Sequence, residues 1–282
     1  MTLFTTSKDG TRIAYETAGA GAPLILVWGA LGVRASPFTK AMRDELAKSF
    51  TVYDYDRRGR GESGDTAPYS VAAEVEDLRA LCTAAGGAPF VWATSSGAAL
   101  ALEAAAAGVP MRRLAAHEPP YAVGAHASKF DRDYPRKVAA LIEAGRRNDA
   151  VRLFMRTVGV PAPFVWLMRF MSFWRTAVAA ANTLPYDAAC VNGFELPAVR
   201  LRTIATPTVV LAGGATPASL RAAAEEVSKT VPGATLRIVP KQNHGIKPAA
   251  LRPVLVELFE QAISRTESVD KTNTKQRTAN AS

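Results

Sequence analysis

The sequence has few cysteines: Cys82 and Cys190 are its two, and they lie far apart among apolar residues. We predict that both are reduced thiols in the core, which favours a cytoplasmic protein over a disulfide-bonded one. Long apolar runs are missing as well, because none approaches the roughly 20 residues that span a bilayer. The first residues also lack the basic region and apolar stretch of a signal peptide. We therefore expect a cytoplasmic protein that does not enter membranes.

Ligand patterns for metals and nucleotides are missing too. No group of residues has the spacing of a metal site, and no glycine-rich nucleotide pattern follows a strand. The net charge of +9 raises the question of nucleic-acid binding, but the basic residues are scattered. They form no stripe interleaved with aromatic residues. We therefore expect no metal, no organic cofactor and no nucleic-acid partner.

The sequence does contain a regular alternation of strand and helix patterns. Apolar runs and alternations predict strands at residues 2–6, 12–17, 23–28, 50–55, 89–92, 113–117, 207–212 and 235–239. Helical spacing predicts helices at residues 36–48, 70–84, 98–107, 218–230 and 248–263. Such alternation predicts an α/β fold, in which a mostly parallel sheet carries helices on both faces.

The alternation is interrupted in the middle of the chain. No strand-like run occurs between residues 119 and 205, and helical patterns at 137–147, 149–157 and 163–180 carry large apolar side chains. We therefore divide the chain into a core domain of residues 1–118 and 206–264 and a helical insertion of residues 119–205. Residues 265–282 are polar, show no apolar periodicity and are predicted to be disordered.

Ser95 lies where a predicted strand changes to a helix, in the sequence Ala93-Thr94-Ser95-Ser96-Gly97. A serine between small residues at such a sharp turn is typical of a nucleophile elbow, which exposes the serine oxygen above the sheet. A serine that caps a helix N-terminus has a similar sequence context. Other residues must therefore decide between the two interpretations.

A serine nucleophile needs a base, and histidine is the usual one because its ordinary pKa lies near neutrality. The chain has three histidines, His117, His126 and His244. His244 follows the last predicted strand, and ligand sites of open parallel sheets lie at the carboxyl ends of the strands. Ser95 and His244 are therefore expected at the same edge, whereas His117 and His126 are not expected to be catalytic.

Together these features resemble the α/β-hydrolases over residues 10–263. The similarity rests on the strand ending in Val27-Trp28-Gly29-Ala30, the glycine-rich loop at 56–64, the Ser95 turn, the helical insertion and the late histidine. The resemblance implies a mostly parallel eight-stranded sheet with a helical cap after the sixth strand. It also implies Ser95 as nucleophile, His244 as base, and the backbone N–H groups of Ala30 and Ser96 as the oxyanion hole.

The chain departs from the usual α/β-hydrolase pattern at two positions. Trp28 stands where the family usually has histidine, and residues 211–217 contain no carboxylate where the family usually has an aspartate. Glu118 directly follows the sixth strand at the same edge of the sheet, and some subfamilies take their acid from there. We therefore expect Glu118 to orient His244 and to stabilise its charged form. The alternatives are an incomplete triad or a Glu118 that only pairs with an arginine.

The sequences Ser95-Ser96-Gly97, His117-Glu118 and the acid-free residues 214–217 also resemble, locally, lactone hydrolases of the zearalenone-degrading type. We expect a serine hydrolase that cleaves an ester or lactone of an apolar small molecule through an acyl-enzyme. A carbon–carbon bond hydrolase of the same fold and a non-catalytic ligand-binding member are the alternatives. The oligomeric state is left open.

Aromatic residues are the expected substrate contacts. The insertion carries them at helical spacing, and we predict Trp166, Phe170 and Trp174, together with Trp28, at the substrate site. The arginines of the loop at 56–64 could bind a substrate carboxylate, but the glycines among them favour a structural role beside the Ser95 turn.

Overall fold

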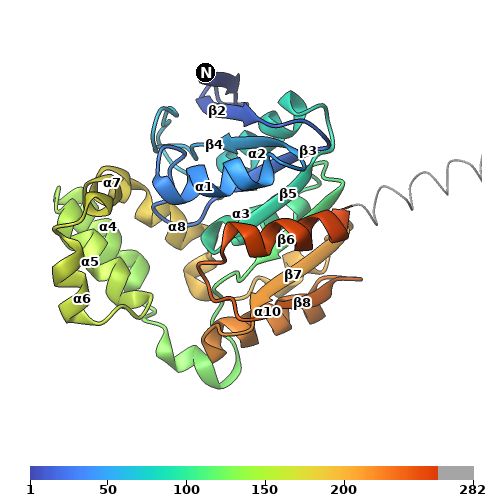
Figure 1. The fold of residues 1–282 in the computed structure, drawn as a ribbon. Coiled ribbons are helices and arrows are strands. Elements are labelled where there is room, and N and C mark those ends of the chain that lie inside the picture. Colours follow the sequence, from blue (N-terminus) through green and yellow to red (C-terminus); the bar gives the residue numbers. More distant parts are fainter. Residues whose placement is uncertain (260–282) are drawn as a thin grey trace, which may run out of the picture.

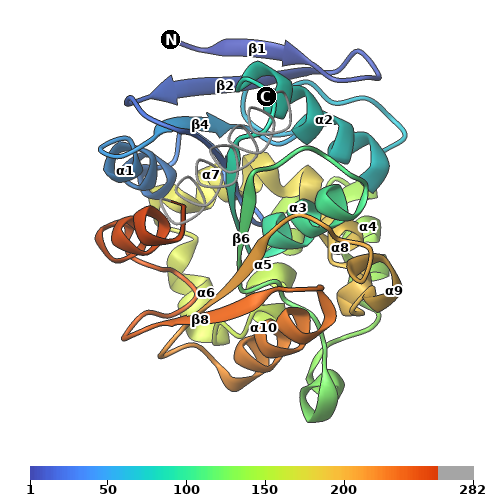
Figure 2. The same ribbon diagram turned by 90° about the vertical axis from the view of Figure 1, so that its right-hand side faces the viewer.

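A computed structural model describes residues 1–259 and contains an eight-stranded sheet (Figures 1 and 2). The spatial order of its strands is β1-β2-β4-β3-β5-β6-β7-β8. The strands are β1 (Leu3–Thr6), β2 (Arg12–Ala18), β3 (Pro23–Val27), β4 (Thr51–Tyr55), β5 (Phe90–Thr94), β6 (Arg113–His117), β7 (Thr208–Gly213) and β8 (Thr235–Val239). β2 pairs antiparallel with β1 and β4, and every pairing from β4 to β8 is parallel. The mostly parallel sheet predicted from the sequence is therefore confirmed.

The central strands are buried on both faces. Successive side chains of a strand point to opposite faces, and in β3 this divides the apolar run between two cores. Ile25 and Val27 belong to one core cluster, whereas Leu24 and Leu26 belong to the other. The same double burial explains why β3 is a continuous apolar run rather than an alternation.

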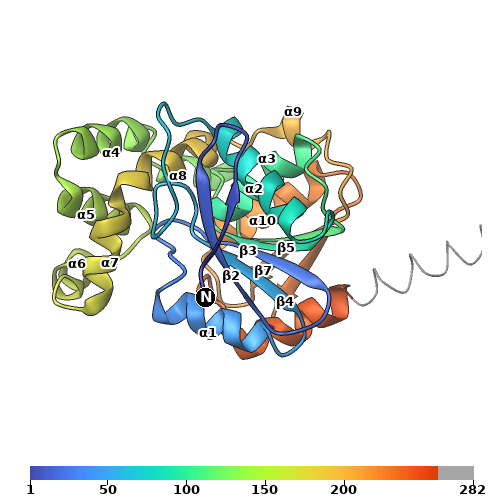
Figure 3. The same cartoon turned by 90° about the horizontal axis from the view of Figure 1, so that it is seen from above.

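Helices cover both faces of the sheet (Figure 3). α2 (Val71–Ala84), α3 (Ser96–Ala106) and α10 (Ala218–Thr230) contribute buried side chains to the core on one face. α1 (Pro37–Leu46) and the helix at residues 248–259 contribute to the core on the other face. The arrangement leaves the carboxyl ends of the parallel strands, where Ser95 follows β5, uncovered by these helices.

The segment between β6 and β7 is helical, and we call residues 119–205 the insertion. It contains α4 (Tyr134–Glu143), α5 (Arg147–Thr157), α6 (Ala162–Met168), α7 (Ser172–Ala180), α8 (Leu184–Cys190) and α9 (Ala198–Leu201). Figure 1 shows α4 to α7 to one side of the sheet, whereas α8 and α9 pack against α3. The insertion therefore reaches back to the helix that begins directly after Ser95.

The prediction of one continuous helix at residues 163–180 was wrong. Hydrogen bonds from Phe170 N to Leu167 O and from Met171 N to Met168 O close a turn after α6. Met171 then adopts an extended conformation (φ −85°, ψ 152°), from which α7 begins. No glycine or proline marks this break at residues 169–171, and the short helices α8 and α9 were not predicted.

None of the helices within residues 1–259 is both long and apolar enough to cross a membrane. The disorder expected for residues 265–282, and the end of the helix expected at 248–263, lie outside the described residues.

Candidate active site

Ser95 is held in a strained turn between β5 and α3. Its backbone angles are φ 57° and ψ −130°, a conformation that costs a residue with a side chain about 1–3 kcal/mol. Glycines make room for this turn, because a Cβ on Gly97 would collide with the carbonyl oxygens of Val27 and Trp28. The Ser95 side chain makes no hydrogen bond that caps α3. The helix-cap interpretation of Ser95 is therefore wrong.

His244 and Glu118 meet at the carboxyl edge of the sheet. His244 lies in the loop between β8 and the helix at 248–259, and Glu118 directly follows β6. The Nδ1–H of His244 donates a hydrogen bond of 2.7 Å to Oε2 of Glu118. Glu118 is fully buried, whereas 41% of the His244 side chain is exposed. The bond fixes one ring nitrogen of His244 and leaves the other, Nε2, for a second partner.

The second carboxylate oxygen of Glu118 is also satisfied. Oε1 accepts a hydrogen bond of 2.8 Å from the backbone N–H of Gly213, at the end of β7. Burial alone raises the pKa of Glu118, but the hydrogen bonds from His244 and from the Gly213 N–H hold the pKa below its ordinary value. Glu118 is therefore a carboxylate at neutral pH, although its side chain is not exposed to solvent.

His117 lies beside this pair but is not part of the exposed site. Its ring is fully buried and stacks against His244 with 6.0 Å between the ring centroids. Burial lowers the pKa of His117 to about 4, so the ring is neutral at physiological pH. His117 therefore packs against His244 as an uncharged ring.

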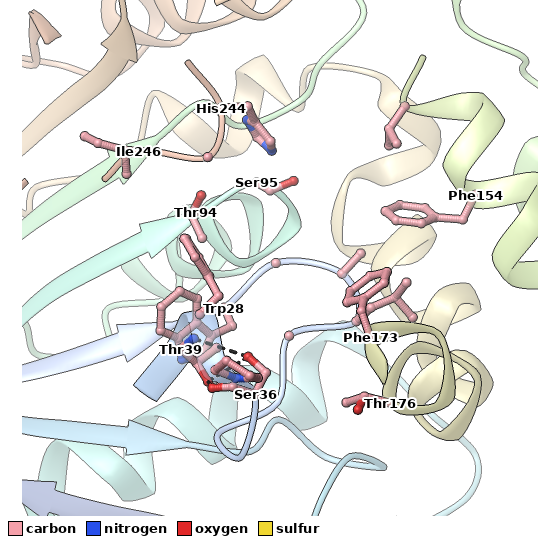
Figure 4. A pocket seen from close by; sticks show the side chains of 18 of the residues that line it. Trp28, Ser36, Thr39, Thr94, Ser95, Phe154, Phe173, Thr176, His244 and Ile246 are labelled. Atoms are coloured by element: carbon pink, nitrogen blue, oxygen red, sulfur yellow. Dashed lines mark hydrogen bonds between the residues drawn. The ribbon is translucent and has the colours of Figure 1, made fainter. Parts of the chain in front are cut away.

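A cavity of about 650 Å³ connects Ser95 and His244 to the insertion. Figure 4 shows both side chains on one side of it, with Phe154 of α5 and Phe173 of α7 facing them. Other lining residues are Trp28, Gly29, Ala30, Leu31, Gly32, Ser36, Pro37, Phe38, Thr39, Trp92, Thr94, Met155, Val158, Ser172, Thr176, Gly245 and Ile246. The candidate site is thus a mostly apolar chamber with its polar groups at the edge of the sheet.

The two backbone amides expected to form an oxyanion hole lie beside Ser95. Ala30 lines the cavity, and within residues 1–259 its N–H donates no backbone hydrogen bond. Ser96 is the first residue of α3, so its N–H has no intrahelical acceptor. A Cβ on Gly29 would lie 2.7 Å from the Cβ of Ser95, which shows how closely the two loops approach. Both amides are available to a ligand atom.

The aromatic side chains predicted to contact a substrate differ in whether they line the cavity. Trp28 lines the cavity, and its indole N–H is fixed by a bond of 2.7 Å to the buried Asp54. Trp166, on α6, and Phe170, in the turn after α6, are 60% and 66% exposed and do not line the cavity. Trp174 does not line it either, because it is buried within the insertion with its indole N–H on Asn148.

Phe154 and Phe173 take the places expected for those aromatic residues. Phe173 lies next to Trp174 in the same helical pattern, but helical spacing alone cannot say which face of α7 meets the sheet. Phe154 lies in α5, whose apolar spacing is typical of a helix that packs against a hydrophobic core. Only the packing of the insertion distinguishes these two side chains from their neighbours.

The arginines of the loop at 56–64 do not reach the cavity. Arg57, Arg58 and Arg60 are each at most 2% exposed. Arg58 pairs with Asp77 at 2.7 Å, and Arg57 pairs with Glu74 at 2.6 Å. The structural role favoured for this loop therefore fits its contacts, and binding of a substrate carboxylate does not.

The described residues hold no group of three or more His, Cys, Asp or Glu side chains that could bind a metal ion. Cys82 and Cys190 are free and buried. Burial raises the pKa of each thiol to about 12, so neither is a reactive thiolate at neutral pH.

Comparisons with known proteins agree with this architecture. A family model described as "Alpha/beta hydrolase family" matches residues 19–256, and no curated protein matches the chain. The crystal structure of an alpha/beta hydrolase from Sphaerobacter thermophilus is 46% identical, with a TM-score of 0.83, and the match covers 92% of this chain and all of that chain.

More distant structures are similar in fold. A thermophilic esterase from Thermogutta terrifontis is 20% identical, with a TM-score of 0.69 over 93% of this chain and 99% of that chain. The enol-lactonase from Burkholderia xenovorans is 19% identical, with a TM-score of 0.68 over 92% of this chain and 100% of that chain. The chain therefore belongs to the alpha/beta hydrolase family, and this membership supports hydrolase activity.

Proposed function

We propose that the protein is a serine hydrolase that cleaves a carboxylic ester or lactone of an apolar small molecule through an acyl-enzyme. The observation that carries the proposal is the hydrogen bond between buried Glu118 and His244, at the cavity that Ser95 also lines. A carboxylate, an imidazole and a strained serine at one edge of a sheet are the parts of a nucleophilic triad. Hydrolysis through these groups needs no metal and no organic cofactor.

The chemistry follows from the proton positions. Glu118 accepts the Nδ1 proton of His244, so Nε2 carries a lone pair that can take the proton of the Ser95 hydroxyl. The serine oxygen then attacks the substrate carbonyl, and the negative charge on the carbonyl oxygen is stabilised by the N–H groups of Ala30 and Ser96. The protonated His244 gives its proton to the leaving alkoxide, and the acyl group stays on Ser95. Water, deprotonated by His244, releases the acid and restores the serine.

The walls of the cavity favour an apolar substrate. Phe38, Met155 and Val158 line it together with the two phenylalanines of α5 and α7. A chamber of about 650 Å³ is in the range that encloses a drug-sized ligand, roughly 300–1,000 Å³. The similarity in fold to an esterase and an enol-lactonase is compatible with this substrate class. We further propose that the insertion acts as a cap over the site and that the enzyme works in the cytoplasm.

Labelling with a fluorophosphonate tests the proposal. The parent protein is expected to gain the mass of one phosphonyl group, and Ser95→Ala is expected to gain none. Ser172→Ala is the matched control, because Ser172 lines the same cavity and is expected to label like the parent. Absence of labelling in the parent, or equal labelling of Ser95→Ala, would refute the serine mechanism and favour a non-catalytic ligand-binding protein.

Turnover separates the remaining alternative. A panel of apolar p-nitrophenyl esters and lactones of increasing ring size is expected to give hydrolysis that Ser95→Ala abolishes. Labelling of Ser95 without turnover of any ester or lactone would contradict the substrate class and favour carbon–carbon bond hydrolysis.

A further inference from the structure

A buried carboxylate of the insertion lies beneath the Ser95 turn. Asp187 belongs to α8 and is 4% exposed. Its Oδ1 accepts hydrogen bonds of 2.8 Å from the hydroxyl of Ser96, 2.7 Å from Arg57 and 2.8 Å from Arg60, and its Oδ2 accepts one of 2.7 Å from Arg60. One side chain from the insertion is thus bonded to the residue that follows Ser95 and to the loop at 56–64.

Arg60 continues this connection to the other side of the cavity. Its Nη1 donates a hydrogen bond of 2.7 Å to the carbonyl oxygen of Gly29. That carbonyl belongs to the same peptide group as the N–H of Ala30. Because a trans peptide is planar, its C=O and N–H point in opposite directions. A guanidinium that holds the Gly29 oxygen in the interior therefore directs the Ala30 N–H towards the cavity that Ala30 lines.

The charge on Arg60 also affects the strength of this donor. A cation bonded to a carbonyl oxygen polarises the peptide, so that its N–H becomes a better hydrogen-bond donor in a low-dielectric interior. Arg57 makes a longer contact of 3.3 Å with the carbonyl oxygen of Trp28, one peptide earlier. The Glu74 carboxylate, bonded to Arg57 at 2.6 Å, balances the second positive charge.

We propose that Asp187 is a positioning residue that holds both halves of the oxyanion hole: Ser96 directly, and the Gly29–Ala30 peptide through Arg60. The inference rests on the proposed serine mechanism and adds a role for the insertion in it. The insertion then covers the substrate and, through Asp187, also orients the two amides that stabilise the transition state. Asp187 itself touches neither the substrate nor Ser95.

The competing explanation is that Asp187 only neutralises two buried arginines. A purely structural ion pair affects the stability of the fold and leaves the affinity for a tetrahedral oxyanion unchanged. The matched control is Asp77→Asn. Asp77 is also buried, and it pairs with Arg58, which belongs to the same loop at 56–64 as Arg57 and Arg60. The described contacts of Arg58 do not include the Gly29 or Trp28 carbonyl oxygens.

The test compares Asp187→Asn and Arg60→Lys with the parent and with Asp77→Asn. Arg60→Lys keeps the positive charge but lacks the planar guanidinium that donates to Asp187 and to the Gly29 carbonyl oxygen at the same time. This variant therefore still tests the inference if Asp187→Asn does not fold. Two ligands are measured: an apolar trifluoromethyl ketone, whose adduct with Ser95 carries an oxyanion, and the corresponding secondary alcohol, which forms none. Thermal unfolding is recorded for every variant.

We expect the trifluoromethyl ketone to bind the two test variants about 10- to 100-fold more weakly, with kcat reduced in proportion and KM nearly unchanged. Binding of the alcohol is expected to stay at the parent value in all variants, and Asp77→Asn is expected to retain parent ketone affinity. Parent ketone affinity in a folded Asp187→Asn or Arg60→Lys variant would overturn the inference. Failure of the proposed mechanism itself looks different, because the parent would then neither label with fluorophosphonate nor bind the ketone more tightly than the alcohol.

Discussion

Replacement of Glu118 by glutamine tests whether Glu118 is the acid that we propose acts with His244. The side chain keeps its size, and the amide can adopt only one orientation. The Gly213 N–H lies 2.8 Å from Oε1 of Glu118 and is a hydrogen-bond donor. It can pair with the amide oxygen but not with the amide NH₂, so the oxygen must face Gly213. The NH₂ group then faces Nδ1 of His244, which becomes an acceptor and leaves the ring proton on Nε2. That tautomer cannot take the proton of Ser95.

The expected loss follows from this change of tautomer and from the loss of the negative charge beside the imidazolium. Replacement of a triad carboxylate by its amide lowers kcat by about 10⁴-fold, which corresponds to about 5.4 kcal/mol of activation free energy. Glu118→Asp keeps the charge but is one methylene shorter. It cannot span both the 2.7 Å bond to His244 and the 2.8 Å bond to Gly213, and we expect a loss of about 10²-fold from the displaced imidazole.

The assay is the rate of phosphonylation of Ser95, measured by mass spectrometry, together with steady-state hydrolysis of an apolar p-nitrophenyl ester. Glu103→Gln is the control, because Glu103 is a glutamate of α3 whose partner is the surface residue Arg200. Thermal unfolding reports whether each variant is folded. A folded Glu118→Gln variant within tenfold of the parent rate would refute the reasoning and place the acid elsewhere.

Three further predictions concern stability, specificity and the His244 loop. Burial raises the pKa of Asp54 to about 7, so this group contributes stability that is lost as the pH rises from about 4 to 7. In urea titrations, the unfolding free energy of Asp54→Asn is therefore expected to exceed that of the parent by up to ~4 kcal/mol at about pH 8 and by almost nothing at about pH 4. Phe154→Ala is expected to lower kcat/KM for a long apolar acyl group about tenfold, whereas the surface control Trp166→Ala is expected to leave it unchanged. A Cβ on Gly213 would lie 2.6 Å from a carbonyl carbon of the loop that carries His244. Gly213→Ala is therefore expected to lower the unfolding free energy by about 1–3 kcal/mol, and to lower the rate of Ser95 phosphonylation more than the change in melting temperature alone explains.

The parts of the site that the sequence predicts are those fixed by local pattern and by sheet topology. The Ser95 turn is recognisable because small residues must flank it, and its glycine requirement is visible in the collision that a Cβ on Gly97 would cause. The meeting of Glu118 with His244 follows from parallel strands, whose carboxyl ends lie at one edge. β6 pairs with β7 and β7 with β8, so residues after these strands are brought together whatever the loops contain.

The walls of the cavity could not be predicted in the same way. Trp166, Phe170 and Phe173 lie within eight residues of one another, and a continuous helix would have directed several of them to one side. The break between α6 and α7 rotates the two halves independently, so Phe173 lines the cavity and Trp166 does not. Which face of a short helix meets the sheet is decided by tertiary packing rather than by spacing.

Asp187 was missed for a different reason. It contacts Arg57, Arg60 and Ser96, which are 130, 127 and 91 residues away in the chain, and no periodicity links such distant positions. One signal was available. Arginines packed beneath the Ser95 turn must be paired, because a buried charge without a partner costs several kcal/mol. A structural role for the loop at 56–64 therefore requires carboxylates from elsewhere in the chain, and Asp187 is one of the acidic residues of the insertion that could supply one.

The position of the acid also has a physical explanation. Gly213 lies at the end of β7, in the segment where the family usually has its aspartate, and the backbone of the His244 loop occupies the space that a side chain there would need. The Gly213 N–H instead becomes a hydrogen-bond donor to the carboxylate on the neighbouring strand. Adjacent strands are about 4.8 Å apart, and the extra methylene of a glutamate helps Glu118 to reach across this spacing to both Gly213 and His244. The absence of a carboxylate in residues 211–217 and the glutamate at residue 118 are therefore two parts of one arrangement, since without Glu118 the His244 ring would have no buried carboxylate partner.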